Sequence, residues 1–253
     1  MQTTAAFTTP APYLGADLTD RHARGRRPVD VCGLWPRSEG GFVARFWQWT
    51  WPEPGQALQT DAIVAEIRSS RSAMLDAPQA LARPGHHLRA AERECRTAGK
   101  TPDGLSRVTG PYAGFVRSSV ELFAALHASG VAISPPACVG GACEYYPADA
   151  WLRLTGARLP GKHTRAGRQV RRELLMVLGV ADLPPLPNHD QNDACLGAVL
   201  AAAADGHVPG LRVALAGEPL ALDDDGDLRE GPIAVPVADA AVTDRLGTVD
   251  LRR

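Results

Sequence analysis

The sequence predicts an α/β protein in which helices cover a mixed β-sheet. Two observations lead to this prediction. Three strand-like segments follow one another near the N-terminus, and the later strand-like segments alternate with stretches of helical periodicity. Consecutive strands commonly pair as an antiparallel meander, whereas strands separated by helices commonly pair in parallel. A chain of 253 residues, of which 45% are hydrophobic, is long enough for one such domain.

The expected strands are short apolar segments that end at polar or turn residues. Five segments fit this description: residues 12–18, 29–35, 41–51, 72–78 and 140–147. The second and third flank the loop PRSEGG, which is typical of a hairpin. Pro78 and Pro147 end the fourth and fifth strands, because proline cannot donate a hydrogen bond to a ladder.

The expected helices show helical periodicity or helical composition between these strands. They cover residues 58–68, 85–98, 112–130, 148–156, 165–179 and 190–204. The helical stretch around 85–130 is an insertion, and the chain after residue 211 forms a short β-rich C-terminal extension. Residues 1–11 are typical of a flexible tail, so we expect residues 12–253 to form a single domain.

Composition limits the location and the partners of the protein. A formal net charge of −1 provides no general attraction to nucleic acid or anionic membrane, so any basic surface must be local. No apolar run approaches the ~20 residues of a membrane span, and the N-terminus does not resemble a secretion signal. The five cysteines are scattered, as in a reduced compartment. We therefore expect a cytoplasmic protein with no membrane partner.

Four aspartates occupy positions at which the expected elements could bring them together. Asp17 ends the first strand and Asp76 the fourth, and parallel pairing can place two such ends side by side. Asp190 and Asp193 are three residues apart at the start of a helix of small residues, so they share a face. The alternative is an ordinary helix start, with Asp190 as the N-cap and Asp193 in the first turn.

Carboxylates that converge in this way repel one another unless cations neutralise them. Oxygen ligands of this kind suit Mg²⁺ or Mn²⁺, and two such ions can activate water for the cleavage of a phosphodiester. Asp17, Asp76 and Asp193 are therefore the candidate metal ligands. A basic segment could bind phosphate through Lys162, Arg165, Arg168 and Arg172, although a solvated helix with packed arginine stems explains it equally well.

Several motifs in this order resemble a known family. They are YLGADL, AMLDAP, CEYYPADAW, KHTRAGRQVRRELL, HDQNDACLGAVLAA and REGPIAVP, spread over residues 12–236. The pattern resembles the family of domain of unknown function 429, described as predicted RNase H-like nucleases. The resemblance implies an RNase H-like five-stranded mixed sheet, ordered 3-2-1-4-5, with helices on both faces.

The same resemblance implies roles for individual residues. Asp17 and Asp76 match the acids of the first and fourth strands, and Asp190 and Asp193 match the pair on the last helix. Glu144 matches the acid of the fifth strand. Ribonuclease H takes one acid from its first helix, so Glu66 is an alternative to Asp76 as a ligand.

Three classes of function remain open from the sequence. The first is a metal-dependent phosphodiester hydrolase, expected to be a nuclease, that acts on nucleic acid or a nucleotide with Mg²⁺ or Mn²⁺. The second is a non-catalytic relative that binds a nucleotide or a partner. The third is a phosphotransferase or a tailoring enzyme for a small metabolite. The family activity is itself inferred from its fold, so it supports the first class only by analogy.

Overall fold

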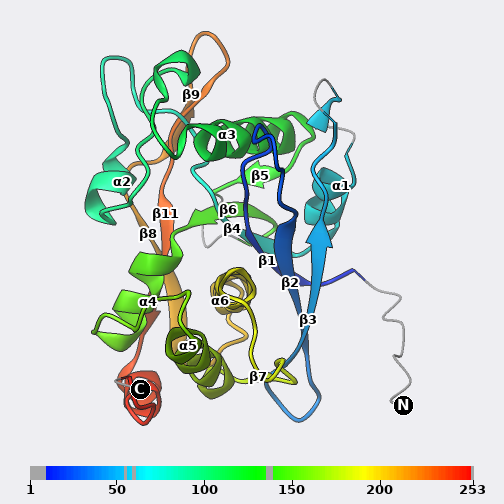
Figure 1. Ribbon diagram of the computed structural model, residues 1–253, viewed down its shortest axis with the longest axis vertical. Helices are drawn as coiled ribbons and strands as arrows, with labels where there is room; N and C mark the ends of the chain where they lie inside the picture. Colours follow the sequence, from blue (N-terminus) through cyan, green and yellow to red (C-terminus); the bar gives the residue numbers. More distant parts are fainter. Residues whose placement is uncertain (1–9, 54–55, 59–60, 135–138, 252–253) are drawn as a thin grey trace.

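The computed structural model describes residues 10–53, 56–58, 61–134 and 139–251, and Figure 1 shows how their elements are arranged. The first nine residues of the expected tail lie outside this description. Ala11, the last residue of that expected tail, is buried in the core and packs with the domain. None of the described helices is long and apolar enough to cross a bilayer.

A mixed sheet forms the centre of the protein. Its first four strands are β1 (Tyr13–Asp17), β2 (Val29–Pro36), β3 (Phe42–Trp49) and β4 (Ser72–Asp76). The fifth expected strand is β6 (Gly141–Tyr145). These strands lie in the order β3-β2-β1-β4-β6, with β3, β2 and β1 antiparallel and β1, β4 and β6 parallel. The α/β class and this strand order agree with the prediction.

The sheet extends beyond the five expected strands at both edges. β7 (Val180–Ala181) pairs with β3. At the other edge β11 (Ile233–Ala238) pairs with β6, and β8 (Leu211–Ala216) pairs with β11. The C-terminal extension is therefore part of the main sheet. Three short strands complete the described set: β5 (Ala132–Ile133), which pairs with β6, and the separate ribbon of β9 (Leu220–Leu222) and β10 (Leu228–Glu230).

Helices cover both faces of the sheet, as Figure 1 shows. One face carries α1 (Ala62–Ser69) and α3 (Ala113–Ala128), which share a core with the alternate residues of β1 and β4. The other face carries α4 (Pro147–Thr155), α5 (Arg165–Val177), α6 (His189–Ala204) and α7 (Ala240–Leu246). The expected insertion contains α2 (Ala90–Glu94), a 3-10 turn η2 (Leu105–Arg107) and α3. The sequence did not predict α7, which follows β11 near the C-terminal end of the described residues.

Local chemistry explains where the helices near the site begin and end. Thr164 accepts a hydrogen bond from the backbone N–H of Gly167 and caps α5. α4 begins with Pro147, whose missing N–H costs nothing in the first turn. It ends at Gly156, which has a φ of 65° and adopts the left-handed conformation that glycine favours.

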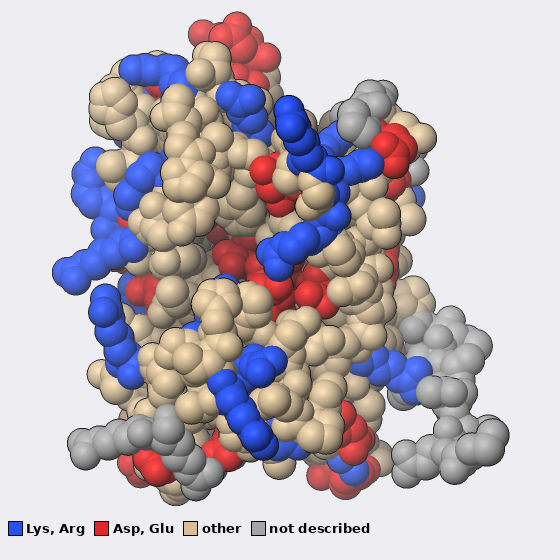
Figure 2. Space-filling model, in the orientation of Figure 1, with Lys and Arg blue, Asp and Glu red and all other residues tan. Residues whose placement is uncertain are grey.

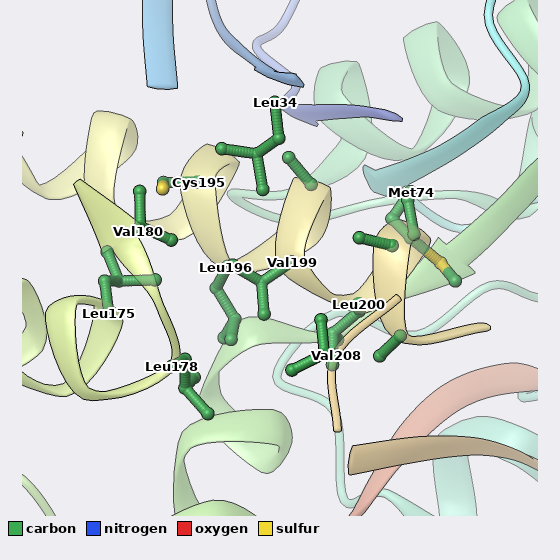
Figure 3. Packing of buried hydrophobic residues seen from close by; sticks show 14 of the residues in the cluster. Leu34, Met74, Leu175, Leu178, Val180, Cys195, Leu196, Val199, Leu200 and Val208 are labelled. Atoms are coloured by element: carbon green, nitrogen blue, oxygen red, sulfur yellow. The ribbon is translucent and has the colours of Figure 1, made fainter. Parts of the chain in front are cut away.

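α6 packs closely against the middle of the sheet because small residues line the contact. A Cβ on Gly15 of β1 would overlap the backbone of Ala194 and Ala198, so helix and strand approach at this glycine. On the other sides of α6, Leu196, Val199 and Leu200 enter a core that Figure 3 shows from close by. The helix is buried along nearly its whole length, which fixes its N-terminus relative to the sheet.

Candidate active site

Three aspartates stand side by side on neighbouring strands. Asp17 of β1 lies opposite Asp30 of β2 and opposite Asp76 of β4 in the register of the sheet. Directly opposed residues on paired strands project to the same face. Gly15, two residues before Asp17, contacts α6, so this row of carboxylates faces the same side as α6.

The N-terminus of α6 adds two further aspartates to this row. Asn188 is the N-cap: its side chain accepts from the N–H of Gln191 at 2.6 Å, and the Gln191 side chain accepts from the N–H of Asn188 at 3.0 Å. The alternative in which Asp190 caps the helix is therefore wrong. Asp190 and Asp193 lie within the first turns and are both buried. We call Asp17, Asp30, Asp76, Asp190 and Asp193 the acidic cluster.

Burial and mutual repulsion make the acidic cluster hard to ionise. Burial raises the pKa of Asp17 well above its usual range, and the charges of Asp76, Asp193 and Asp190 raise it further. Burial, followed by the charge of Asp193, raises the pKa of Asp76 to about 8. The Oδ2 atom of Asp17 is buried and accepts no hydrogen bond from the residues that the structure describes. Such an atom is costly unless a cation or a donor faces it.

Two cations lie against the acidic cluster. Lys162 donates to Oδ2 of Asp193 at 3.0 Å, while Trp151 donates to Oδ1 of the same carboxylate at 2.9 Å. Burial works against the charge of the Lys162 ammonium, but the attraction of Asp193 and Asp17 outweighs it and raises the pKa of Lys162. Arg27 forms an ion pair with Asp190 at 3.2 Å, and its side chain is 64% exposed. In Figure 2, acidic side chains gather at the centre of one face, and a basic side chain lies over their edge.

Glu144 and Glu66 lie apart from the row of aspartates. Glu144 stands opposite Leu75 on the neighbouring strand, whose side chain joins the core under α1 and α3. There Arg89 donates two hydrogen bonds of 2.6 Å to the Glu144 carboxylate. Burial still leaves the pKa of Glu144 raised, although Arg89 opposes this. Glu66 accepts from Trp49 Nε1 at 2.6 Å on the same side. Of the two alternatives, the structure brings Asp76 and not Glu66 beside Asp17.

The basic segment of residues 162–172 is only partly directed to the acidic cluster. Lys162 reaches it, as described above. Arg172 donates to the carbonyl oxygens of Pro184 and Leu183, at 2.7 and 3.4 Å, and so holds the linker before α6. Arg165 is exposed, and Arg168 is half-buried on the same helix. Phosphate binding by these three arginines stays a prediction.

Asp30 and Arg27 belong to the site although the sequence did not predict them. Asp30 accepts from Gln48 at 3.2 Å and from the N-cap Asn188 at 3.4 Å, so it ties the hairpin to the start of α6. The signal for both residues lies in the segment RGRRPVDV, where arginines precede an aspartate at the start of a strand. That segment lies beside Asp17 only because β1 and β2 pair in this register.

The donor set suits a hard divalent cation. Among the described residues, no three His, Cys, Asp or Glu side chains are grouped closely enough to hold a metal ion as they stand. The chemistry nevertheless fits, because the acidic cluster presents five carboxylates, one with a buried orphan oxygen, against two cations. Asp17, Asp76 and Asp193 are the residues that would hold Mg²⁺ or Mn²⁺.

The fold and the site define an α/β protein with buried carboxylates at one end of its central strands. A family model, described as protein of unknown function (DUF429), matches residues 29–217, and the chain belongs to this family. The match contains Asp30, Asp76 and the two aspartates of α6, whereas Asp17 precedes it. No curated protein and no solved structure gave a significant match to the chain.

Proposed function

We propose that this protein is a metal-dependent phosphodiester hydrolase of the RNase H-like type. The observation that supports it most is the acidic cluster, in which Asp17 pairs with Asp76, senses the charges of Asp190 and Asp193, and has a buried oxygen without a hydrogen bond from any described residue. If Asp17 had only a structural role, a protein donor would be expected to pair with that oxygen. In a metal site the same oxygen must be available to the metal ion. The strand order β3-β2-β1-β4-β6, with an acidic helix across β1, supports the RNase H-like assignment.

Each residue of the site has a role that follows from its position. Two divalent ions bound by Asp17, Asp76 and Asp193 would activate a water molecule and stabilise the leaving oxygen. Lys162 and Arg27 lie at the edge of the acidic cluster, where they can bind the phosphate oxygens of a substrate. Trp151 and the backbone of β1 hold Asp193 and Asp17 in place, so little reorganisation is needed.

The substrate class follows from this chemistry. A nucleic acid or a nucleotide provides the phosphate ester, and both are available in the cytoplasm, where we place the protein. In this proposal Glu144 assists only indirectly, because its negative charge raises the pKa of Asp76.

Manganese binding tests the proposal directly. At a concentration 100-fold above Kd, a ligand stabilises the folded state by about 2.7 kcal/mol. For a chain of this size that corresponds to a rise of about 5–10 °C in Tm. We expect Mn²⁺ to raise the Tm of the wild type, and Asp17→Asn and Asp193→Asn to abolish the rise. Asp224→Asn, in an exposed turn, is the matched control and should keep it.

Hydrolysis of bis-p-nitrophenyl phosphate provides the activity readout. It should require Mg²⁺ or Mn²⁺, disappear with chelator, and be lost in Asp17→Asn. If Mn²⁺ raises the Tm of the wild type and of both cluster variants equally, the assignment of the metal ligands is wrong. If neither metal changes Tm or activity, the protein is not a metal-dependent hydrolase.

A further inference from the structure

A cavity of about 320 Å³ opens beside the acidic cluster. Asp76, Asp193 and Lys162 form one end of it. The other walls come from the loop around residues 97–101 in the insertion and from the junction of β6 with α4. Its volume lies at the lower end of the range of small-molecule sites, about 300–1,000 Å³. The cavity therefore has room for a small molecule that extends away from the acids.

Aromatic side chains form much of the cavity wall. Tyr112 and Phe115 belong to the start of α3, Tyr146 precedes α4, and Trp151 lies within α4. Arg171, which also lines the cavity, is 8% exposed, and its Nε makes no hydrogen bond to any described residue. Aromatic walls with a few buried polar groups are typical of a site for a flat ring with polar edges.

A buried ionic network holds one wall of the cavity in place. Arg89 is fully buried and bridges Glu144 of β6 to Glu92 of α2, and both glutamates line the cavity. Glu92 in turn accepts from the backbone N–H of Thr101 at 3.0 Å and from its hydroxyl at 2.5 Å. The insertion is thus attached to the sheet through these contacts, and the cavity is preformed.

We propose that the cavity binds the base of a nucleoside phosphate whose phosphate group lies at Asp76, Asp193 and Lys162. This inference rests on the proposed function and specifies its substrate. A base that stacks on the aromatic side chains inside this cavity cannot be paired in a duplex at the same time. The substrate is therefore the unpaired end of a single strand, with its terminal phosphodiester at the acidic cluster, and continuous duplex is excluded. A nucleoside monophosphate is the corresponding product and serves as a probe of the site.

Binding of four nucleoside 5′-monophosphates, measured by calorimetry with Mn²⁺-loaded protein, tests this inference. Ribose 5-phosphate is the probe without a base. Because stacking of one base on aromatic side chains is worth about 1–3 kcal/mol, we expect at least one monophosphate to bind about tenfold or more tightly than ribose 5-phosphate. Equal binding of all five probes would overturn the inference.

Two substitutions block the cavity without entering the core. Ala148 of α4 and Ala98 of the insertion are exposed and line the cavity, so Ala148→Trp or Ala98→Trp should fill it. In each variant the monophosphates should bind no more tightly than ribose 5-phosphate. The binding of ribose 5-phosphate and the stabilisation by Mn²⁺ should persist. Ala124→Trp, exposed on α3 and outside the cavity, is the matched control. If both blocked variants keep the advantage of the base, the base binds elsewhere.

Competition against a bound monophosphate tests whether the cavity accepts a substrate that carries a phosphodiester. A dinucleotide, which carries the phosphodiester, should displace the monophosphate, and failure to displace it would overturn the inference. A blunt-ended duplex of two complementary strands should not compete, and competition by it would overturn the inference. Loss of the response to Mn²⁺ in the wild type would instead refute the proposed function. If Mn²⁺ still raises the Tm but the monophosphates bind no more tightly than ribose 5-phosphate, only the inference about the cavity is refuted.

Discussion

Replacement of Asp76 by Asn removes one charge from the acidic cluster and keeps the size of the side chain. The pKa of Asp76 is raised from 3.8 to about 8 in the folded protein. The unfolded chain therefore loses this proton near pH 4, whereas the folded protein keeps it until about pH 8. Folding takes up a proton between these values, so the free energy of unfolding falls as the pH rises from about 4 to about 8.

The size of the effect follows from the separation of the two pKa values. About four pKa units correspond to about 6 kcal/mol if the difference is fully expressed. Because Asp76 is only half-buried, solvent reduces this, and we expect a gain for Asp76→Asn on the order of 2–3 kcal/mol at pH 8. At pH 4.5, less than one pH unit above the pKa of the unfolded chain, most of this loss of stability has not yet occurred, so the two proteins should differ by less than about 1 kcal/mol.

Urea unfolding followed by far-ultraviolet circular dichroism, with chelator present, measures this difference at pH 4.5 and pH 8. Asp224→Asn should match the wild type at both values, because it lies in an exposed turn. Addition of Mn²⁺ at 100-fold above Kd should cancel most of this difference at pH 8, since only the wild type gains the stabilisation of about 2.7 kcal/mol. An Asp76→Asn protein that is no more stable than the wild type at pH 8 would refute the electrostatic account of the acidic cluster.

Two further predictions concern the scaffold, and urea unfolding checks both. Arg89→Met should lower the free energy of unfolding by about 3–5 kcal/mol, because the buried Glu144 loses its partner. The control Arg93→Met, at an exposed position of α2, should change it by less than about 0.5 kcal/mol. Equal effects of the two substitutions would contradict the role of the network. Gly15→Ala should cost about 1–3 kcal/mol because its Cβ would overlap the backbone of α6, whereas Gly25→Ala meets open space and should be tolerated.

Short-range patterns were sufficient for most of the central elements. Strand ends at Asp17 and Asp76 follow from apolar runs that stop at a polar residue, and α6 follows from its small apolar residues. β7 was not predicted because a strand of two residues is too short to show an alternating pattern. α7 was not predicted because the short apolar runs after residue 211 favoured strands. The extent of the sheet could not be predicted, since pairing of β11 with β6 joins segments far apart in the chain.

The position of Glu144 illustrates a second limit. It lies one residue before the end of β6, which pairs with β4, and its resemblance to the fifth-strand acid of the family predicted a place at the same edge. Successive residues of a strand face opposite sides, so the register puts Tyr145 next to Asp76 and sends Glu144 to Arg89. One residue of register separates an acid that faces the site from one in a buried ion pair. The sequence does not display that register.

The sequence by itself determined the α/β class, the order of the central strands and the four aspartates that meet at one end of the sheet. The class depends on local periodicity and the meeting of the aspartates on the rule that parallel strand ends share an edge, whereas the strand order is what the resemblance to the family implies. Tertiary structure alone decided that Asp30 joins the row, that Lys162 and Arg27 oppose it, and that a cavity lies beside it. Those facts depend on pairing register and on contacts between distant segments, which no local pattern of residues encodes.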